Sequence, residues 1–181
     1  GYESDRNRLC VYELATGKKN YVSEKFDSSV EGFVWNKDNK SLSFIGVWHG
    51  TLNLYQANFK GEVKQITNEW ADYGSISLAN NGNKLLATKA SMSHPTDIYI
   101  VTPGKDAKST KVEQITREND HILNQLNLGK CEQRWVKTTD GKQMLVWIML
   151  PSNFDANKKY PTLLFCEGGP QSPVSQFWSY R

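Results

Sequence analysis

Residues 54–67 read LYQANFKGEVKQIT, and residues 98–116 repeat this pattern, because they also begin with a hydrophobic residue and tyrosine and end with Gln-Ile-Thr. The hydrophobic–tyrosine pair occurs a third time at Val11-Tyr12, so the three pairs lie 43 and then 44 residues apart. Each pair ends an alternating segment and is followed by a polar turn. A period of this length is typical of one blade of a β-propeller.

The segments before the second and third pairs repeat as well. Residues 33–42 (FVWNKDNKSL) align with residues 76–85 (ISLANNGNKL), and both have the pattern strand, tight turn, strand. Asn, Asp and Gly favour such turns because they tolerate left-handed backbone angles. Each repeat is therefore predicted to be a four-stranded antiparallel meander, which must stack on a neighbour to bury both of its faces.

About two and a half such units fit into residues 1–128. Closed propellers need about four blades or more, so either further blades lie outside this sequence or the strands form an open curved sheet. A third interpretation is an ordinary β-sandwich whose internal similarity is accidental. The recurrence of Gln-Ile-Thr weighs against the sandwich.

Composition narrows the class of protein. The 181 residues are 38% hydrophobic and 23% charged, as in soluble globular proteins. The net charge of +3 is spread along the chain without a basic stripe, so nucleic acid is not expected as a partner. The longest apolar stretch, residues 144–150, is far shorter than the roughly 20 residues of a membrane helix. The widely spaced Cys10, Cys131 and Cys166 argue against a disulfide framework and are predicted to be buried thiols.

The last third of the chain changes character after Thr116. Residues 132–138 and 143–150 are predicted to form a hairpin around the Asp140-Gly141 turn. Further on, residues 162–166 (TLLFC) are short, β-prone and apolar, as expected of a strand buried on both faces of a parallel or mixed sheet. We place a domain boundary near residue 128, which divides the chain into residues 1–128 and 129–181.

A family resemblance rests on the combination of Tyr160-Pro161, the apolar segment and Gly168-Gly169-Pro170. This combination resembles the first strands of the hydrolase domain in the prolyl oligopeptidase family, especially in its dipeptidyl-peptidase and acylaminoacyl-peptidase branches. The ending at residues 177–181 looks most like the bacterial dipeptidyl-peptidase V type. The resemblance covers the whole chain. It implies a mainly β chain in which the last blades of a β-propeller precede the first strands of an α/β-hydrolase domain.

The resemblance also implies an oxyanion loop at Glu167, Gly168 and Gly169. In an α/β-hydrolase, backbone N–H groups stabilise the negatively charged oxygen that forms when a carbonyl is attacked, and glycine permits close approach. Several branches of the family have at the position of Glu167 a tyrosine whose hydroxyl is the donor. A carboxylate would repel an oxyanion, so a backbone role or pairing with a cation remains open for Glu167. The alternative is that Gly168-Gly169-Pro170 is only a tight turn.

Catalytic and metal-binding residues are not expected within this sequence. There is no Gly-x-Ser-x-Gly, and in these hydrolases the serine, aspartate and histidine follow the Gly-Gly-Pro strand, which places the triad beyond Arg181. His49, His94 and His121 are predicted to be surface or structural residues. No two Cys or His residues stand at ligand spacing, so no metal is expected, and nothing indicates a cofactor.

Two functions of different classes fit the sequence. In the first, the chain is part of a serine-type exopeptidase that hydrolyses short peptides through an acyl-enzyme, and this part alone is inactive. The resemblance then implies a periplasmic or secreted protein, with any signal peptide outside this segment. In the second, the chain is a stand-alone propeller-like module that binds peptides or proteins along its strand edges. Exposed edges and apolar faces also predict self-association.

Overall fold

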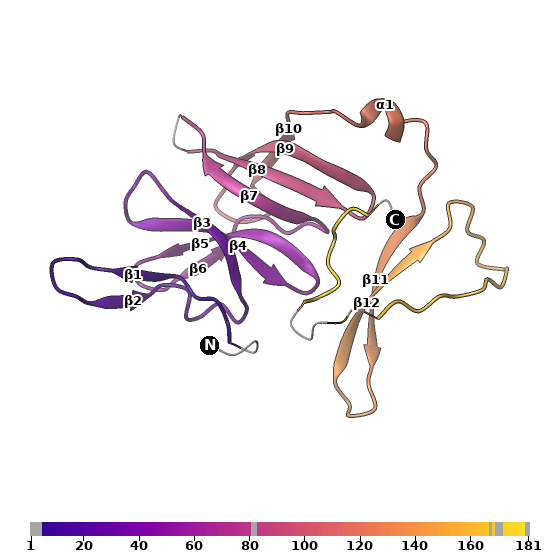
Figure 1. Ribbon diagram of the computed structural model, residues 1–181, viewed down its shortest axis with the longest axis horizontal. Coiled ribbons are helices and arrows are strands. Elements are labelled where there is room, and N and C mark those ends of the chain that lie inside the picture. Colours follow the sequence, from indigo (N-terminus) through magenta and orange to yellow (C-terminus); the bar gives the residue numbers. More distant parts are fainter. Residues whose placement is uncertain (1–4, 81–82, 167, 169–171, 180–181) are drawn as a thin grey trace.

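The computed structural model describes residues 5–80, 83–166, 168 and 172–179. Figure 1 shows two neighbouring groups of strands with a separate hairpin beside them. In chain order the elements are β1 (Cys10–Tyr12), β2 (Lys19–Tyr21), β3 (Val30–Trp35), β4 (Ser41–Trp48), β5 (Thr51–Asn58), β6 (Val63–Gln65), β7 (Asp72–Leu78), β8 (Leu85–Ser91), β9 (His94–Thr102), β10 (Lys111–Gln114), α1 (Asp120–Leu123), β11 (Lys130–Lys137) and β12 (Gln143–Leu150).

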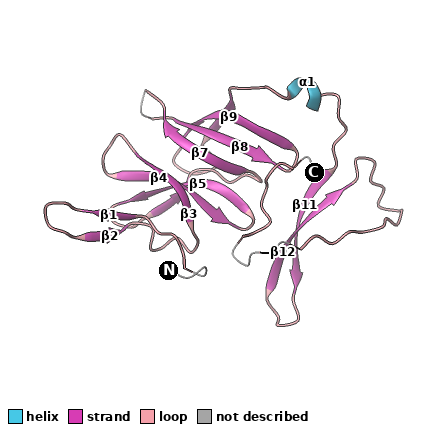
Figure 2. Cartoon of the chain, in the orientation of Figure 1, coloured by secondary structure: helices cyan, strands magenta, loops and turns pink. Residues whose placement is uncertain are grey.

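The strands form the meanders that the repeat predicts. Strands β3 to β6 make one four-stranded antiparallel meander and β7 to β10 make the next, while β1 and β2 form a preceding antiparallel pair. A single parallel pair, Leu52 with Asp72, joins the two meanders at their adjoining strands β5 and β7. Strands dominate the chain (Figure 2), so the predicted mainly β class is confirmed.

The β3–β6 meander is buried on both faces. Phe44 and Ile45 are consecutive on β4 and point to opposite sides, yet their side chains are only 0% and 1% exposed. Phe44 belongs to a hydrophobic cluster with Leu9 and Val22, which directly precede β1 and directly follow β2. Ile45 belongs to a second cluster, shared with β7, β8 and β9. This meander is therefore held by stacking between its two neighbours, as a propeller blade is.

The recurrent Gln-Ile-Thr has a defined role in each meander. The Thr67 hydroxyl accepts a hydrogen bond from the Leu54 N–H at 2.9 Å and donates one to Asn53 at 2.9 Å. The Thr116 hydroxyl accepts a hydrogen bond from the Ile98 N–H at 2.9 Å and donates one to the side chain of Asp97, which precedes Ile98 as Asn53 precedes Leu54. Because this threonine completes the hydrogen bonding where the fourth strand ends, its recurrence reflects a shared backbone requirement.

The isoleucines of the two Gln-Ile-Thr triplets differ in burial. Ile66 is completely buried because the following meander packs against it. Ile115, at the equivalent place in the next meander, is 49% exposed. Within the described residues no further meander follows β10 to cover it.

The predicted hairpin is confirmed, and the predicted strand after it is wrong. Strands β11 and β12 pair in register around Gly141, which has a φ of +83°. Residues 162–166, by contrast, belong to no strand, and Leu163 and Leu164 are 97% and 85% exposed. A strand buried on both faces needs other elements beside and above it, and the described part of the chain places none there.

The thiols also differ from their prediction. Cys10 and Cys166 are exposed and Cys131 is half-buried, so burial of all three is wrong. Cys10 lies on a two-stranded pair, and Cys166 follows the exposed apolar residues 163–165, which no other described part of the chain covers. In the part of the chain that is described, no helix is long and apolar enough to cross a membrane.

Gly46 on β4 gives a test of the blade packing. A Cβ added there would lie 2.5 Å from a ring carbon of Phe26 and 2.8 Å from one of Tyr55. We expect Gly46→Ala to lower the free energy of unfolding by about 1–3 kcal/mol, because an overpacked core must shift. Gly32→Ala is the control, since a Cβ added there would lie 3.7 Å from the Ile45 side chain, an ordinary contact distance, and it should change stability by less than about 0.5 kcal/mol. Equal effects of both variants in urea unfolding would contradict the described packing.

Candidate functional site

The oxyanion loop predicted from the sequence is described only at its centre. Gly168 is exposed, and a Cβ added to it would meet no atom of the described residues within 4 Å. Glu167 and Gly169 lie outside the described residues. Open space around Gly168 is compatible with close approach of a substrate to the backbone, and the oxyanion role of all three residues stays a prediction.

A joint between the meanders and the β11–β12 hairpin is built largely from aromatic side chains. Trp70, in the loop before β7, packs edge-on against Trp147 of β12, with ring centroids 5.4 Å apart. His49, in the β4–β5 turn, stacks on Trp48 at 4.4 Å and meets Trp135 of β11 edge-on at 5.1 Å. His49 thus packs within this joint, which agrees with its prediction as a surface or structural residue. Aromatic contacts of this kind hold the hairpin beside the blades.

The C-terminal segment runs through the same joint. In Figure 1 this segment, coloured yellow, runs along the ends of the β7–β9 strands, on the side of the meanders that faces the hairpin. The Trp147 indole N–H donates to the Val174 carbonyl at 3.0 Å. Ser175 and Gln176 are 9% and 2% exposed although both are polar, so this segment is an integral part of the packing.

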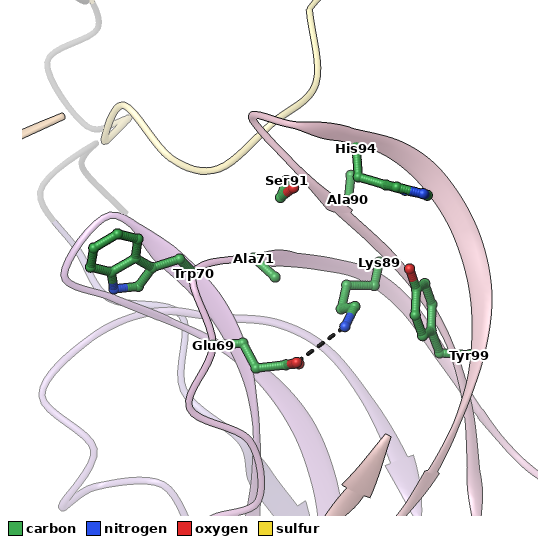
Figure 3. A pocket seen from close by; sticks show the side chains of 8 residues that line it. All are labelled: Glu69, Trp70, Ala71, Lys89, Ala90, Ser91, His94 and Tyr99. Atoms are coloured by element: carbon green, nitrogen blue, oxygen red, sulfur yellow. Dashed lines mark hydrogen bonds and ion pairs between the residues drawn. The ribbon is translucent and has the colours of Figure 1, made fainter. Parts of the chain in front are cut away.

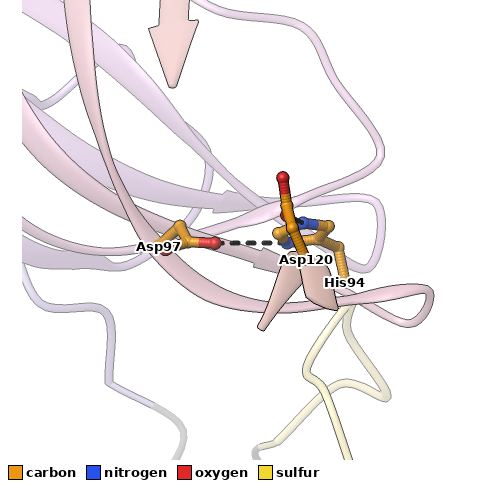
Figure 4. A group of neighbouring side chains, drawn as sticks. All are labelled: His94, Asp97 and Asp120. Carbon is orange, nitrogen blue, oxygen red and sulfur yellow. Dashed lines mark ion pairs between the residues drawn. The ribbon is translucent and has the colours of Figure 1, made fainter. Parts of the chain in front are cut away.

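His94 lies between two carboxylates, a grouping that the sequence analysis missed. Its Nδ1 is 3.9 Å from Asp97 and its Nε2 is 3.8 Å from Asp120, which comes from α1 (Figure 4). The three side chains are close enough to hold a metal ion. However, the ring nitrogens face different carboxylates, and the Asp97 oxygens already accept hydrogen bonds from Thr116 and Gln114. The His94 Nδ1 also lies 2.8 Å from the Pro95 carbonyl oxygen, so these polar atoms already have partners within the described protein.

A cavity of about 360 Å³ lies next to this cluster, between the 69–71 loop and strands β8 and β9. Figure 3 shows the Lys89 ammonium directed toward Glu69, with Trp70 and Tyr99 on either side. The Lys89 Nζ is 3.1 Å from the Glu69 carboxylate and 4.2 Å from the centre of the Tyr99 ring. Tyr73 donates its hydroxyl hydrogen to the same carboxylate.

The charges in this cavity compensate one another. Burial raises the pKa of Tyr73 far above its ordinary value, and the nearby Glu69 carboxylate raises it further, so the phenol stays neutral and remains a donor. Burial likewise raises the pKa of Tyr99. Glu69 and Lys89 are held by each other and by the two rings, an arrangement that stabilises the cavity wall rather than providing a reactive acid or base. The wall residues come from separate strands, which is why spacing along the sequence gave no signal for them.

The chain is similar in sequence over its whole length to part of two dipeptidyl-peptidases. It is 44% identical over 182 aligned residues to dipeptidyl-peptidase 5 of Porphyromonas gingivalis, with all of this chain and 26% of that protein covered. It is 31% identical to dipeptidyl-peptidase 5 of Schizosaccharomyces pombe, over 99% of this chain and 26% of that protein. The chain therefore spans about a quarter of the length of these relatives. No protein-family model matches it.

Solved structures show the same fold. An acylaminoacyl peptidase of Pyrococcus horikoshii superimposes with a TM-score of 0.77 at 20% sequence identity, over 99% of this chain and 26% of that one. Dipeptidyl peptidase 4 of P. gingivalis superimposes with a TM-score of 0.68 at 18% identity, over 98% of this chain and 26% of that one. Since the sequence and the fold agree over nearly every residue, the chain belongs to the prolyl oligopeptidase family of peptidases.

Proposed function

We propose that this chain is the part of a serine-type dipeptidyl-peptidase in which the last propeller blades meet the first strands of the hydrolase domain, with the boundary near residue 128. The observation that carries the proposal is the 44% identity to dipeptidyl-peptidase 5 over the whole chain. The stacked meanders and the hairpin that follows them support it, because they occur in the order that such a peptidase requires.

The chemistry that we propose is acyl transfer. A serine beyond Arg181 attacks the carbonyl of a short peptide while a histidine takes the serine proton. The scissile C–N bond then breaks, the histidine gives this proton to the departing amine, and water hydrolyses the remaining acyl-enzyme to release the acid and regenerate the serine. This segment would contribute blades that admit short peptides to the active site and exclude folded proteins. It would also contribute a backbone N–H near Gly168 that stabilises the oxyanion. Alone it would lack a nucleophile and be inactive.

The exposed apolar segment fits this proposal. Leu163, Leu164 and Phe165 are 97%, 85% and 71% exposed, which is costly for a segment that interacts with nothing. In the longer protein, further strands of the hydrolase sheet would cover these side chains. In the 181-residue chain they would promote self-association.

The proposal predicts where activity resides. The longer protein that contains this segment should release dipeptides from dipeptidyl-p-nitroanilides and react with a fluorophosphonate, which labels activated serines. The 181-residue chain should do neither. A longer protein that is not labelled and releases no product would contradict the proposal, as would turnover by the 181-residue chain that survives repurification. An acylated aminoacyl-p-nitroanilide, assayed in parallel, tests the dipeptidyl assignment, which faster cleavage of this substrate would contradict.

Gly168→Ala tests the oxyanion role with little structural disturbance. The added methyl group meets no described atom within 4 Å, so the melting temperature of the longer protein should not change. If the substrate approaches this backbone closely, the added methyl group would push the substrate oxygen away from the N–H donor, and kcat/KM should fall about tenfold; complete removal of one oxyanion donor costs about 10²–10³-fold in other enzymes. Gly32→Ala, on β3 and with room for its Cβ, is the control. Unchanged kcat/KM in Gly168→Ala would contradict the role.

A further inference from the structure

Three consecutive residues, Val174 to Gln176, connect the hairpin to the blades through hydrogen bonds to four different elements or turns. Val174 is bound by Trp147 of β12, as described above. The Gln176 side chain accepts a hydrogen bond from the Met92 N–H, in the β8–β9 turn, at 3.4 Å and directs its Nε2 to the Cys131 sulfur, on β11, at 3.7 Å. These residues are far apart in the sequence, so the segment closes a long-range joint.

Asp72 holds the centre of this segment. One oxygen of its carboxylate accepts the Ser175 hydroxyl hydrogen at 2.6 Å, and the other accepts the Leu52 N–H at 3.2 Å. The backbone N–H of Gln176 also donates to this carboxylate. Asp72 is the first residue of β7 and forms the parallel pair with Leu52 that joins the two meanders. A single side chain thus binds β5, β7 and the C-terminal segment.

The surroundings leave little room for this segment to move. A Cβ added to Gly50, in the β4–β5 turn, would lie 3.0 Å from the Val174 carbonyl oxygen and 2.8 Å from the Trp147 indole nitrogen. Burial raises the pKa of Asp72, while the Ser175 hydroxyl and the N–H groups of Gln176 and Leu52 lower it. A half-buried carboxylate is therefore compensated by three donors, two from the C-terminal segment and one from β5.

We infer that Asp72 is a positioning residue for the proposed peptidase, because its carboxylate fixes residues 174–176 to the blades and so limits where the preceding chain can lie. Val174 follows Gly168 by six positions, so the two are tethered within about 20 Å even if that chain is fully extended. Loss of the tether would let the hydrolase part shift relative to the blades, and small misplacements of reacting groups lower rates strongly. This inference rests on the proposed function.

The test uses the longer protein and compares Asp72→Asn with Asp106→Asn. Asp106 accepts a hydrogen bond from the Ser109 hydroxyl at 2.8 Å, three residues away in the β9–β10 loop, and so has the same chemistry without long-range connections. Fluorophosphonate titration gives the concentration of active serines, so kcat is measured per active site and loss of folded protein does not affect it. We expect Asp72→Asn to lower kcat about tenfold with less than about twofold change in KM, because the lost interaction is one of alignment. Asp106→Asn should match the unsubstituted protein.

Ser175→Ala is the milder variant, and it tests the positioning role of Asp72 if Asp72→Asn does not fold. It removes one donor and leaves the two backbone donors to Asp72, so kcat should fall about threefold, whereas Ser109→Ala should have no effect. The inference would be overturned if kcat per active site of Ser175→Ala stays within 1.5-fold of the unsubstituted protein. It would also be overturned if folded Asp72→Asn stays within twofold, even where the melting temperature falls. An unsubstituted protein that neither cleaves dipeptidyl substrates nor reacts with the fluorophosphonate would overturn the proposed function and this inference together.

Discussion

Burial of both faces of the β3–β6 meander is the constraint on which the rest of the structure depends. A four-stranded antiparallel sheet exposes an apolar face unless something covers it, and here both faces are apolar: Phe44 and Tyr55 lie on one side, Ile45 and Leu54 on the other. The N-terminal strands cover the first face and β7 to β9 cover the second. Stacking in sequence, with one parallel contact at Leu52, is the arrangement that buries both.

Because stacked meanders bury their faces with repeated contacts, the repeated part of the fold could be predicted from the sequence. Repeats reveal contacts that recur, so the meanders and their turns follow from the period, while the hydrogen bonds of Thr67 and Thr116 are known only from the structure. The β11–β12 hairpin follows from local turn chemistry at Asp140-Gly141. These features depend on neighbours along the chain. Side chains that meet only once, such as Asp72 and Ser175, leave no repeated or local signal.

The errors in prediction have a related cause. The apolar character of residues 162–166 indicates a side chain environment that the described residues do not supply, so the segment is exposed and forms no strand. Of the predicted oxyanion loop, only Gly168 is described, and its open surroundings are compatible with its role. The His94 cluster was missed because Asp120 comes from the connector after β10, 26 positions away in the sequence.

Amide hydrogen exchange of the 181-residue chain, resolved by strand, tests the stacking account most directly. Protection reports the free energy of local opening, which is highest where a strand is covered on both faces and paired on both edges. The amides of β4 and β5 should exchange slowest, and those of β10, which pairs only with β9 among the described strands, should exchange much faster. Exchange in β4 as fast as in β10 would contradict the claim that stacking of the meanders holds this structure together.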